Sequence, residues 1–73
     1  MVSYKPLFKL LIDRNMSKAD LRRLADISPN TMTKLRRGEE VSMSVLNKIC
    51  VALSVTYGDI VEYVHLKEDA ETK

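Results

Sequence analysis

The 73-residue sequence contains no tryptophan, one cysteine, one histidine, two glycines and two prolines. A single cysteine cannot form an internal disulfide, so the default expectation is a reducing, cytoplasmic environment. The lone histidine, His65, and Cys50 together do not supply the ligands of a tetrahedral metal site. With only Gly38 and Gly58, the chain has no glycine-rich loop that could cradle a phosphate. We therefore expect no catalytic residue, no cofactor and no metal, which argues against an enzyme.

The chain also lacks a long apolar run. No stretch approaches the roughly 18 apolar residues of a membrane-spanning helix, and the N-terminus does not show the organisation of a secretion signal. Hydrophobic residues make up 45% of the chain and charged residues 30%, which is typical of a folded globular protein. The length suits one small domain, which we place at residues 1–66 and follow with a charged, flexible tail at 67–73. So small a core favours dimerisation.

Charge is distributed unevenly along the chain, although the net charge is only +2. Residues 14–37 contain seven lysines and arginines and two aspartates, a local charge of +5. Residues 57–73 contain two lysines and five acidic residues, a local charge of −3. The basic central segment is therefore a candidate surface for facing phosphates.

Turn and cap signals divide the chain into five segments of helical length, and no stretch indicates a strand. The first segment covers about residues 4–15, where Pro6 suits a first turn and apolar residues recur at i, i+3 and i+4 spacing. The second begins at Ser17, with Asp20 three positions later as the partner in a capping box. The apolar face of this second segment consists of Leu21, Leu24 and Ala25.

The third segment begins at Ser28, and Pro29 follows at the favoured first helical position. Its apolar positions are Met32 and Leu35, and Gly38 ends it. The fourth segment begins after Ser42 and has a broad apolar face, which predicts the central core helix. That face consists of Val45, Leu46, Ile49, Cys50 and Leu53.

The fifth segment begins near Thr56, with Asp59 three positions later, and its apolar residues are Ile60, Val61 and Val64. Five short helices joined by tight connections predict an all-α fold, a compact five-helix bundle. Cys50, which lies among apolar neighbours, is interpreted as a small core hydrophobe rather than a reactive thiol.

Residues 17–38 are the most informative part of the chain. Two helix starts lie eleven residues apart, at Ser17 and Ser28, and a glycine closes the second, basic helix. A short helix, a tight turn and a second basic helix are used to place side chains in the DNA major groove. The plain alternative is that a basic run is a solvated helix face, and we favour it for three arginines. These are Arg22, Arg23 and Arg36.

The ordered set of features resembles the Cro/C1-type (XRE) helix-turn-helix family in its small single-domain form, over nearly the whole chain. The stretches that carry the resemblance are LFKLLIDRNMSKADLRRL, ISPNTMTKLRRGE, VSMSVLNKICVAL and YGDIVEYV. The resemblance implies a lambda-repressor-like fold and sequence-specific binding of double-stranded DNA. Three positions depart from the family pattern. Lys18 replaces a frequent glutamine, Arg22 a small residue and Asp26 a frequent turn glycine; aspartate tolerates the left-handed conformation such a turn needs.

The buried positions of the third segment leave its opposite side free to read bases. On that side the resemblance and the spacing place the candidate base-reading residues, which are Pro29, Asn30, Thr33 and Lys34. Asn30 can pair with adenine, and Lys34 can donate to guanine. The candidate phosphate-contacting residues are Lys18, Ser28, Thr31, Arg37, Ser42 and Ser44.

The last segment has two interpretations. Its apolar residues either close the core or form a self-complementary patch of Val61, Tyr63 and Val64 for a homodimer. A two-fold dimer would place two recognition helices about 34 Å apart, one turn of DNA. We expect a transcriptional repressor that binds an inverted repeat, with no membrane or small-molecule partner. The alternative is a protein-interaction or antitoxin-type module with the same fold and weak DNA binding.

Overall fold

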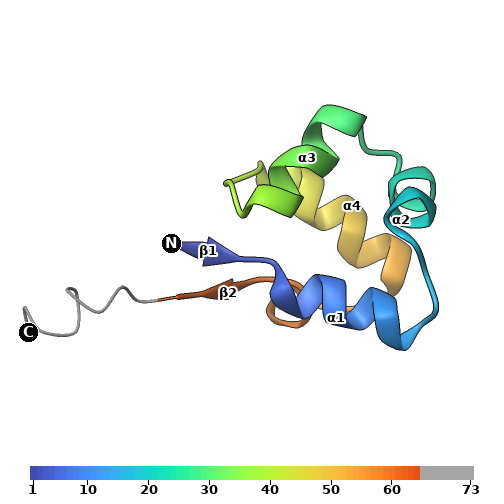
Figure 1. Ribbon diagram of the computed structural model, residues 1–73, viewed down its shortest axis with the longest axis horizontal. Helices are drawn as coiled ribbons and strands as arrows, with labels where there is room; N and C mark the ends of the chain where they lie inside the picture. Colours follow the sequence, from blue (N-terminus) through green and yellow to red (C-terminus); the bar gives the residue numbers. More distant parts are fainter. Residues whose placement is uncertain (65–73) are drawn as a thin grey trace, which may run out of the picture.

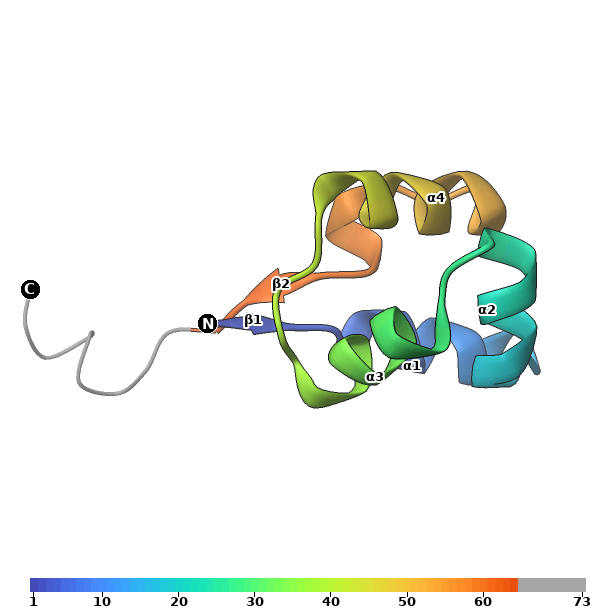
Figure 2. The same cartoon turned by 90° about the horizontal axis from the view of Figure 1, so that it is seen from above.

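The computed structural model describes residues 1–64. His65 and the charged tail predicted at residues 67–73 lie outside the described residues, and so does the predicted domain boundary at residue 66. The described elements are β1 (Val2–Ser3), α1 (Lys5–Asp13), α2 (Lys18–Ala25), α3 (Pro29–Arg37), α4 (Met43–Leu53), the 3-10 turn η1 (Tyr57–Asp59) and β2 (Glu62–Tyr63). α2 lies at one end of the molecule and the two strands at the other (Figure 1), and the view from above in Figure 2 shows the same arrangement.

The prediction of five helices is correct for the first four and wrong for the fifth. At the fifth segment, the Asp59 carboxylate accepts hydrogen bonds from the backbone N–H of Thr56 at 3.0 Å and from its hydroxyl at 3.1 Å. These bonds close a single 3-10 turn of three residues, after which Ile60 enters the core with no exposed surface. The following residues include β-branched and aromatic side chains that favour extended backbone, so the chain continues as β2.

The prediction that the chain has no strand is also wrong. β1 and β2 pair antiparallel, with Val2 opposite Tyr63 and Ser3 opposite Glu62. The N-terminal ammonium donates to the Val64 carbonyl at 3.1 Å, and the Val64 N–H donates to the Met1 carbonyl at 2.7 Å. The sheet therefore joins the two ends of the described chain. Strands of two residues are too short to show an alternating pattern in the sequence.

The core lies between the four helices and is closed by the turn η1. α2 packs against both α3 and α4, and η1 packs against α1 and α4. The buried apolar residues are Tyr4, Leu7, Leu11, Leu21, Ala25, Ile27, Met32, Leu35, Leu46, Ile49, Leu53 and Ile60. In α4, as predicted for the central core helix, Leu46, Ile49 and Leu53 are buried, while Val45 and Cys50 are half-buried against them.

Two predicted core residues are instead exposed. Leu24 is 58% exposed and Ile12 is 75% exposed, because each lies outside the narrow buried stripe of its short helix. Cys50 packs against the core, and burial, with Asp59 as a smaller contribution, raises the pKa of its thiol. Within residues 1–64, no helix is both long enough and apolar enough to cross a bilayer.

Candidate nucleic-acid interface

The first helix of the candidate interface begins at a reciprocal cap. The Ser17 hydroxyl accepts from the Asp20 N–H at 3.0 Å, and the Asp20 carboxylate accepts from the Ser17 N–H at 3.0 Å. These hydrogen bonds to the charged form lower the pKa of Asp20 below its ordinary value of 3.8. Asp20 also forms an ion pair with Arg23 at 2.7 Å. The predicted capping box is therefore confirmed, and it fixes where α2 begins.

The turn between α2 and α3 contains an aspartate in the left-handed conformation. Asp26 has φ 56° and ψ 53°, and the next N–H, from Ile27, donates to the Arg22 carbonyl at 3.1 Å. Ile27 is buried and ties the turn to the core. The expectation that Asp26 could take the place of a turn glycine is confirmed, since aspartate adopts this conformation more readily than most residues.

The second helix of the candidate interface begins at Ser28 and ends at Gly38, as predicted. The Ser28 hydroxyl accepts from the Thr31 N–H at 3.1 Å and donates to the Thr31 hydroxyl at 3.0 Å. Met32 and Leu35 are buried, and Gly38 adopts a left-handed φ of 75° that ends the helix. The buried pair holds one side of α3 against the core and turns the other side outward.

The outward side of α3 carries the residues predicted to read bases. Pro29, Asn30 and Lys34 are exposed, whereas Thr33 is half-buried and its hydroxyl donates to the Pro29 carbonyl at 3.1 Å. Within residues 1–64, the side chains of Asn30 and Lys34 have no hydrogen bond or ion pair. The amide of Asn30 and the ammonium of Lys34 are thus free to bind another molecule.

The predicted phosphate-contacting residues lie at the beginnings and ends of helices. Lys18 is exposed in the first turn of α2, and its ammonium lies 5.4 Å from the centre of the Phe8 ring, within cation–π range. The Ser42 hydroxyl caps α4 by accepting from the Val45 N–H at 3.3 Å, and Ser44 is exposed one residue inside that helix. Arg37 ends α3 and lies 3.7 Å from Glu39.

A cleft between α2 and α3, which we call the α2–α3 cleft, has a volume of about 330 Å³. It is lined by Lys18, Ala19, Arg22, Pro29, Met32, Thr33 and Arg36. Sequence analysis assigned Arg22 and Arg36 to a solvated face and missed their position here. The available signal was the departure at Arg22, where an arginine stands in place of a small residue. The prediction for Arg23 agrees with its exposure and its ion pair.

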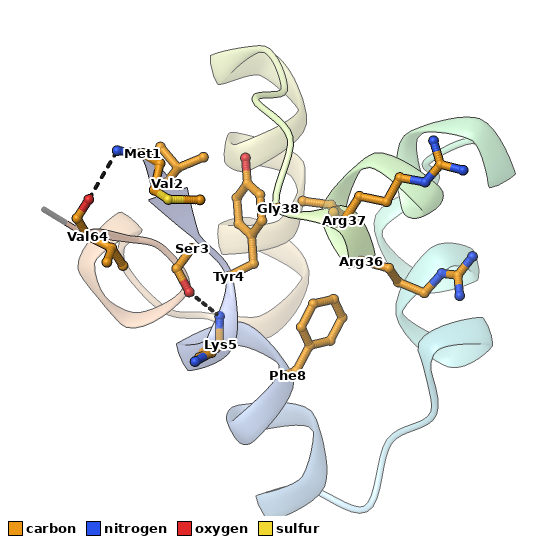
Figure 3. A pocket seen from close by; sticks show the side chains of 11 residues that line it. Met1, Val2, Ser3, Tyr4, Lys5, Phe8, Arg36, Arg37, Gly38 and Val64 are labelled. Carbon is orange, nitrogen blue, oxygen red and sulfur yellow. Dashed lines mark hydrogen bonds between the residues drawn. The ribbon is translucent and has the colours of Figure 1, made fainter. Parts of the chain in front are cut away.

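A second pocket of about 320 Å³ lies between β1, α1 and the end of α3 (Figure 3). The Tyr4 hydroxyl donates to the Glu39 carbonyl at 2.9 Å, and burial raises the pKa of Tyr4. The side chains of Arg36 and Arg37 extend away from Tyr4 and Phe8 (Figure 3). This pocket is lined mainly by apolar surface and follows from the packing of the strand against the helices.

The residues of the predicted dimer patch differ in exposure. Val61 is half-buried and packs against the core, whereas Tyr63 is 61% exposed and Val64 is 38% exposed. The core-closing interpretation therefore fits Ile60 and Val61, and the surface of β2 retains Tyr63 and Val64. Their role in a dimer stays a prediction.

Two short helices joined by a tight turn, the second presenting unpaired amide and ammonium groups, define a helix-turn-helix DNA-binding domain. Residues 7–65 match the profile of the Cro/C1-type HTH DNA-binding domain, and the chain belongs to this family. It is a family of binding domains, not of enzymes.

The chain is also similar to a solved protein of known description. The crystal structure of the transcriptional regulator VanUg, Form II, superposes with a TM-score of 0.86 at 46% sequence identity, covering 89% of this chain and 87% of that chain. No curated protein matches the chain. The match with VanUg extends over nearly the whole molecule, so the helix-turn-helix is compared in its complete structural context.

Proposed function

We propose that this protein is a sequence-specific regulator of transcription that represses by occupying an inverted-repeat operator as a homodimer. The observation that carries the proposal is the outward face of α3, where Asn30 and Lys34 are exposed and have no partner within residues 1–64. The similar structure, VanUg, is described as a transcriptional regulator, which supports the same role here. The +5 charge of residues 14–37 suits a polyanionic partner.

Specificity would come from α3 lying in the major groove with its N-terminal residues leading. The Asn30 amide can donate to and accept from one adenine edge, and the Lys34 ammonium can donate to guanine O6 or N7. The Thr33 hydroxyl donates within the helix, which leaves its oxygen as an acceptor and its methyl group for a thymine methyl. Pro29 has no N–H and contributes by packing.

Positioning would come from contacts with the DNA backbone on either side of α3. Lys18 lies at the start of α2, where free N–H groups and the helix dipole also favour a phosphate. Ser42 and Ser44 do the same at the start of α4. Ser28, Thr31 and Arg37 lie at the two ends of α3 itself. Each set fixes the position of the domain on the duplex without reading sequence.

A homodimer follows from the size of the module. One domain that reads a few base pairs binds weakly, and a two-fold pair doubles the contacts and requires an inverted repeat. The exposed part of β2, with Tyr63 and Val64, is the surface we propose for the contact. Repression needs only that the dimer occupy a promoter, which a protein of this size can do in the cytoplasm without a sensor domain.

The test is selection of bound sequences from a random duplex library, followed by determination of the mass of the complex in solution. A palindromic consensus with half-sites about one helical turn apart, bound by two protein chains, is the expected result. An asymmetric consensus bound by one chain would remove the dimer and keep the DNA reading. No enrichment at low salt, together with a stable complex with another protein, would replace the proposal with an interaction module.

A further inference from the structure

The α2–α3 cleft contains three cationic side chains and no carboxylate. Lys18, Arg22 and Arg36 line it, and the remaining lining residues are uncharged. Asp20, the acidic residue within α2, is engaged by Arg23 at 2.7 Å and by the Ser17 N–H, and it does not line the cleft. Positive charge is thus concentrated here without a counter-charge from the described residues.

Arg22 is the least ordinary of the three. It is half-buried, whereas Arg14, Arg23, Arg36 and Arg37 are exposed, and within residues 1–64 its guanidinium has no hydrogen bond or ion pair. It also lines a second hollow, of about 520 Å³, on the other side of the start of α3. A guanidinium partly removed from water with five unused donors is costly unless it meets an acceptor, and its planar fork suits phosphate oxygens.

Arg36 reaches the same cleft from α3. Its side chain extends away from the apolar pocket around Tyr4 and Phe8 (Figure 3), and within residues 1–64 it also has no ion pair. The cleft shares Pro29 and Thr33 with the outward face of α3. A duplex seated on that face therefore passes its backbone along the cleft.

We propose that the α2–α3 cleft is a phosphate-binding site, in which Arg22 and Arg36 hold one phosphodiester of the DNA backbone beside Lys18. This inference rests on the proposed function, and it revises the interpretation of Arg22 and Arg36 as merely solvated. The small residue usual at the position of Arg22 in related sequences could not make this contact. The arginine therefore adds a non-specific, charge-assisted contact at the helix crossing.

The experiment measures duplex binding by Arg22→Ala, Arg36→Ala and the double variant over a series of salt concentrations. Each single variant is expected to bind any duplex about five- to tenfold more weakly at low salt, and to lower the salt slope by about one. Lys9→Ala, an exposed cation on the far side of α1 without a partner within residues 1–64, removes the same charge elsewhere and is the matched control. Arg22→Ala introduces the small residue usual in the family, so the fold should persist, as far-UV circular dichroism will show.

The outcomes separate this site from the function on which it rests. If the parent binds duplexes and both arginine variants match Lys9→Ala in affinity and salt slope, the site is overturned and the function stands. If the parent shows no salt-dependent binding to any duplex, both fall. Inorganic phosphate and chloride at equal ionic strength distinguish the source of the anion. A stronger effect of phosphate, lost in Arg22→Ala, assigns free phosphate to the cleft as well; equal effects leave the DNA backbone as its ligand.

Discussion

Arg14 links the end of the first helix to the end of the fourth: its Nη1 donates to the Leu53 carbonyl at 2.6 Å. Leu53 is the last residue of α4, and Ser54 follows in the left-handed conformation with φ 57°. Carbonyls in the last turn of a helix lack partners within the helix, so the guanidinium satisfies a group that would otherwise need water. One of the cations of the basic central segment therefore stabilises the fold.

We predict that Arg14→Ala lowers the free energy of unfolding by about 1 kcal/mol, the usual net value of one hydrogen bond of this kind. Urea denaturation followed by circular dichroism measures it. DNA affinity of the folded variant should remain that of the parent, because Arg14 is not among the proposed contacts. An unchanged unfolding midpoint would show that water replaces the guanidinium without loss.

Gly38 leads to a second prediction about stability. Its φ of 75° disfavours any residue with a Cβ, although an added Cβ would lie 3.7 Å from the Val2 carbonyl oxygen, an ordinary contact. The cost of Gly38→Ala is therefore one of backbone conformation, about 1 kcal/mol. Gly58→Ala is the matched control, because nothing lies within 4 Å of its added Cβ and its φ is not positive. Equal thermal midpoints for the two variants would contradict this argument.

The first four helices could be predicted because their signals are local. Ser17, Ser28 and Ser42 cap the helices that follow them, and the apolar spacing within each segment indicates the buried side. The strands could not be predicted, because β1 and β2 pair residues from opposite ends of the described chain over only two positions each. The fifth helix failed for a related reason. Asp59 and Thr56 close a turn whether or not a helix follows.

The outward face of α3 was also predictable, since Met32 and Leu35 define the opposite side. The cleft was not. Whether Arg22 points into solvent or lies half-buried depends on how α3 crosses α2, which is a property of packing and not of spacing along one helix. Leu24 shows the same limit, since i, i+3 spacing placed it inside and the neighbouring helices leave it outside.

Acid should destabilise the protein through its capping aspartates. Because hydrogen bonds lower the pKa of Asp20 below 3.8 in the folded state, its stabilising effect is complete above that value and is lost as pH falls through the folded pKa. Asp20→Asn removes the charge and retains an acceptor. The variant is expected to melt below the parent at neutral pH, and the difference should shrink as pH falls below 3.8. Thermal melts from pH 7 to pH 2 measure it; a difference independent of pH would assign the effect to packing.

The base-reading residues are tested by binding to single-base-pair variants of the selected operator. Asn30→Ala and Lys34→Ala should each weaken binding to the operator by about 1–3 kcal/mol and relax the preference at one position each. The two positions should differ, since the side chains lie one turn apart on α3. Fluorescence anisotropy over the panel measures both effects. Weaker binding with unchanged preferences would make them phosphate contacts instead.

Lys18 should behave in the opposite way. It lies at the first position of α2 with its ammonium over Phe8, so it contributes charge near the backbone and no base contact. Lys18→Ala should weaken binding to every member of the same panel equally and lower the salt slope by about one. Lys18→Gln installs the amide frequent in related sequences, which can still donate to a phosphate. It should recover part of the affinity while keeping the lower salt slope, because the slope counts charges and the affinity also counts hydrogen bonds. A change in base preference in either variant would place Lys18 among the base-reading residues.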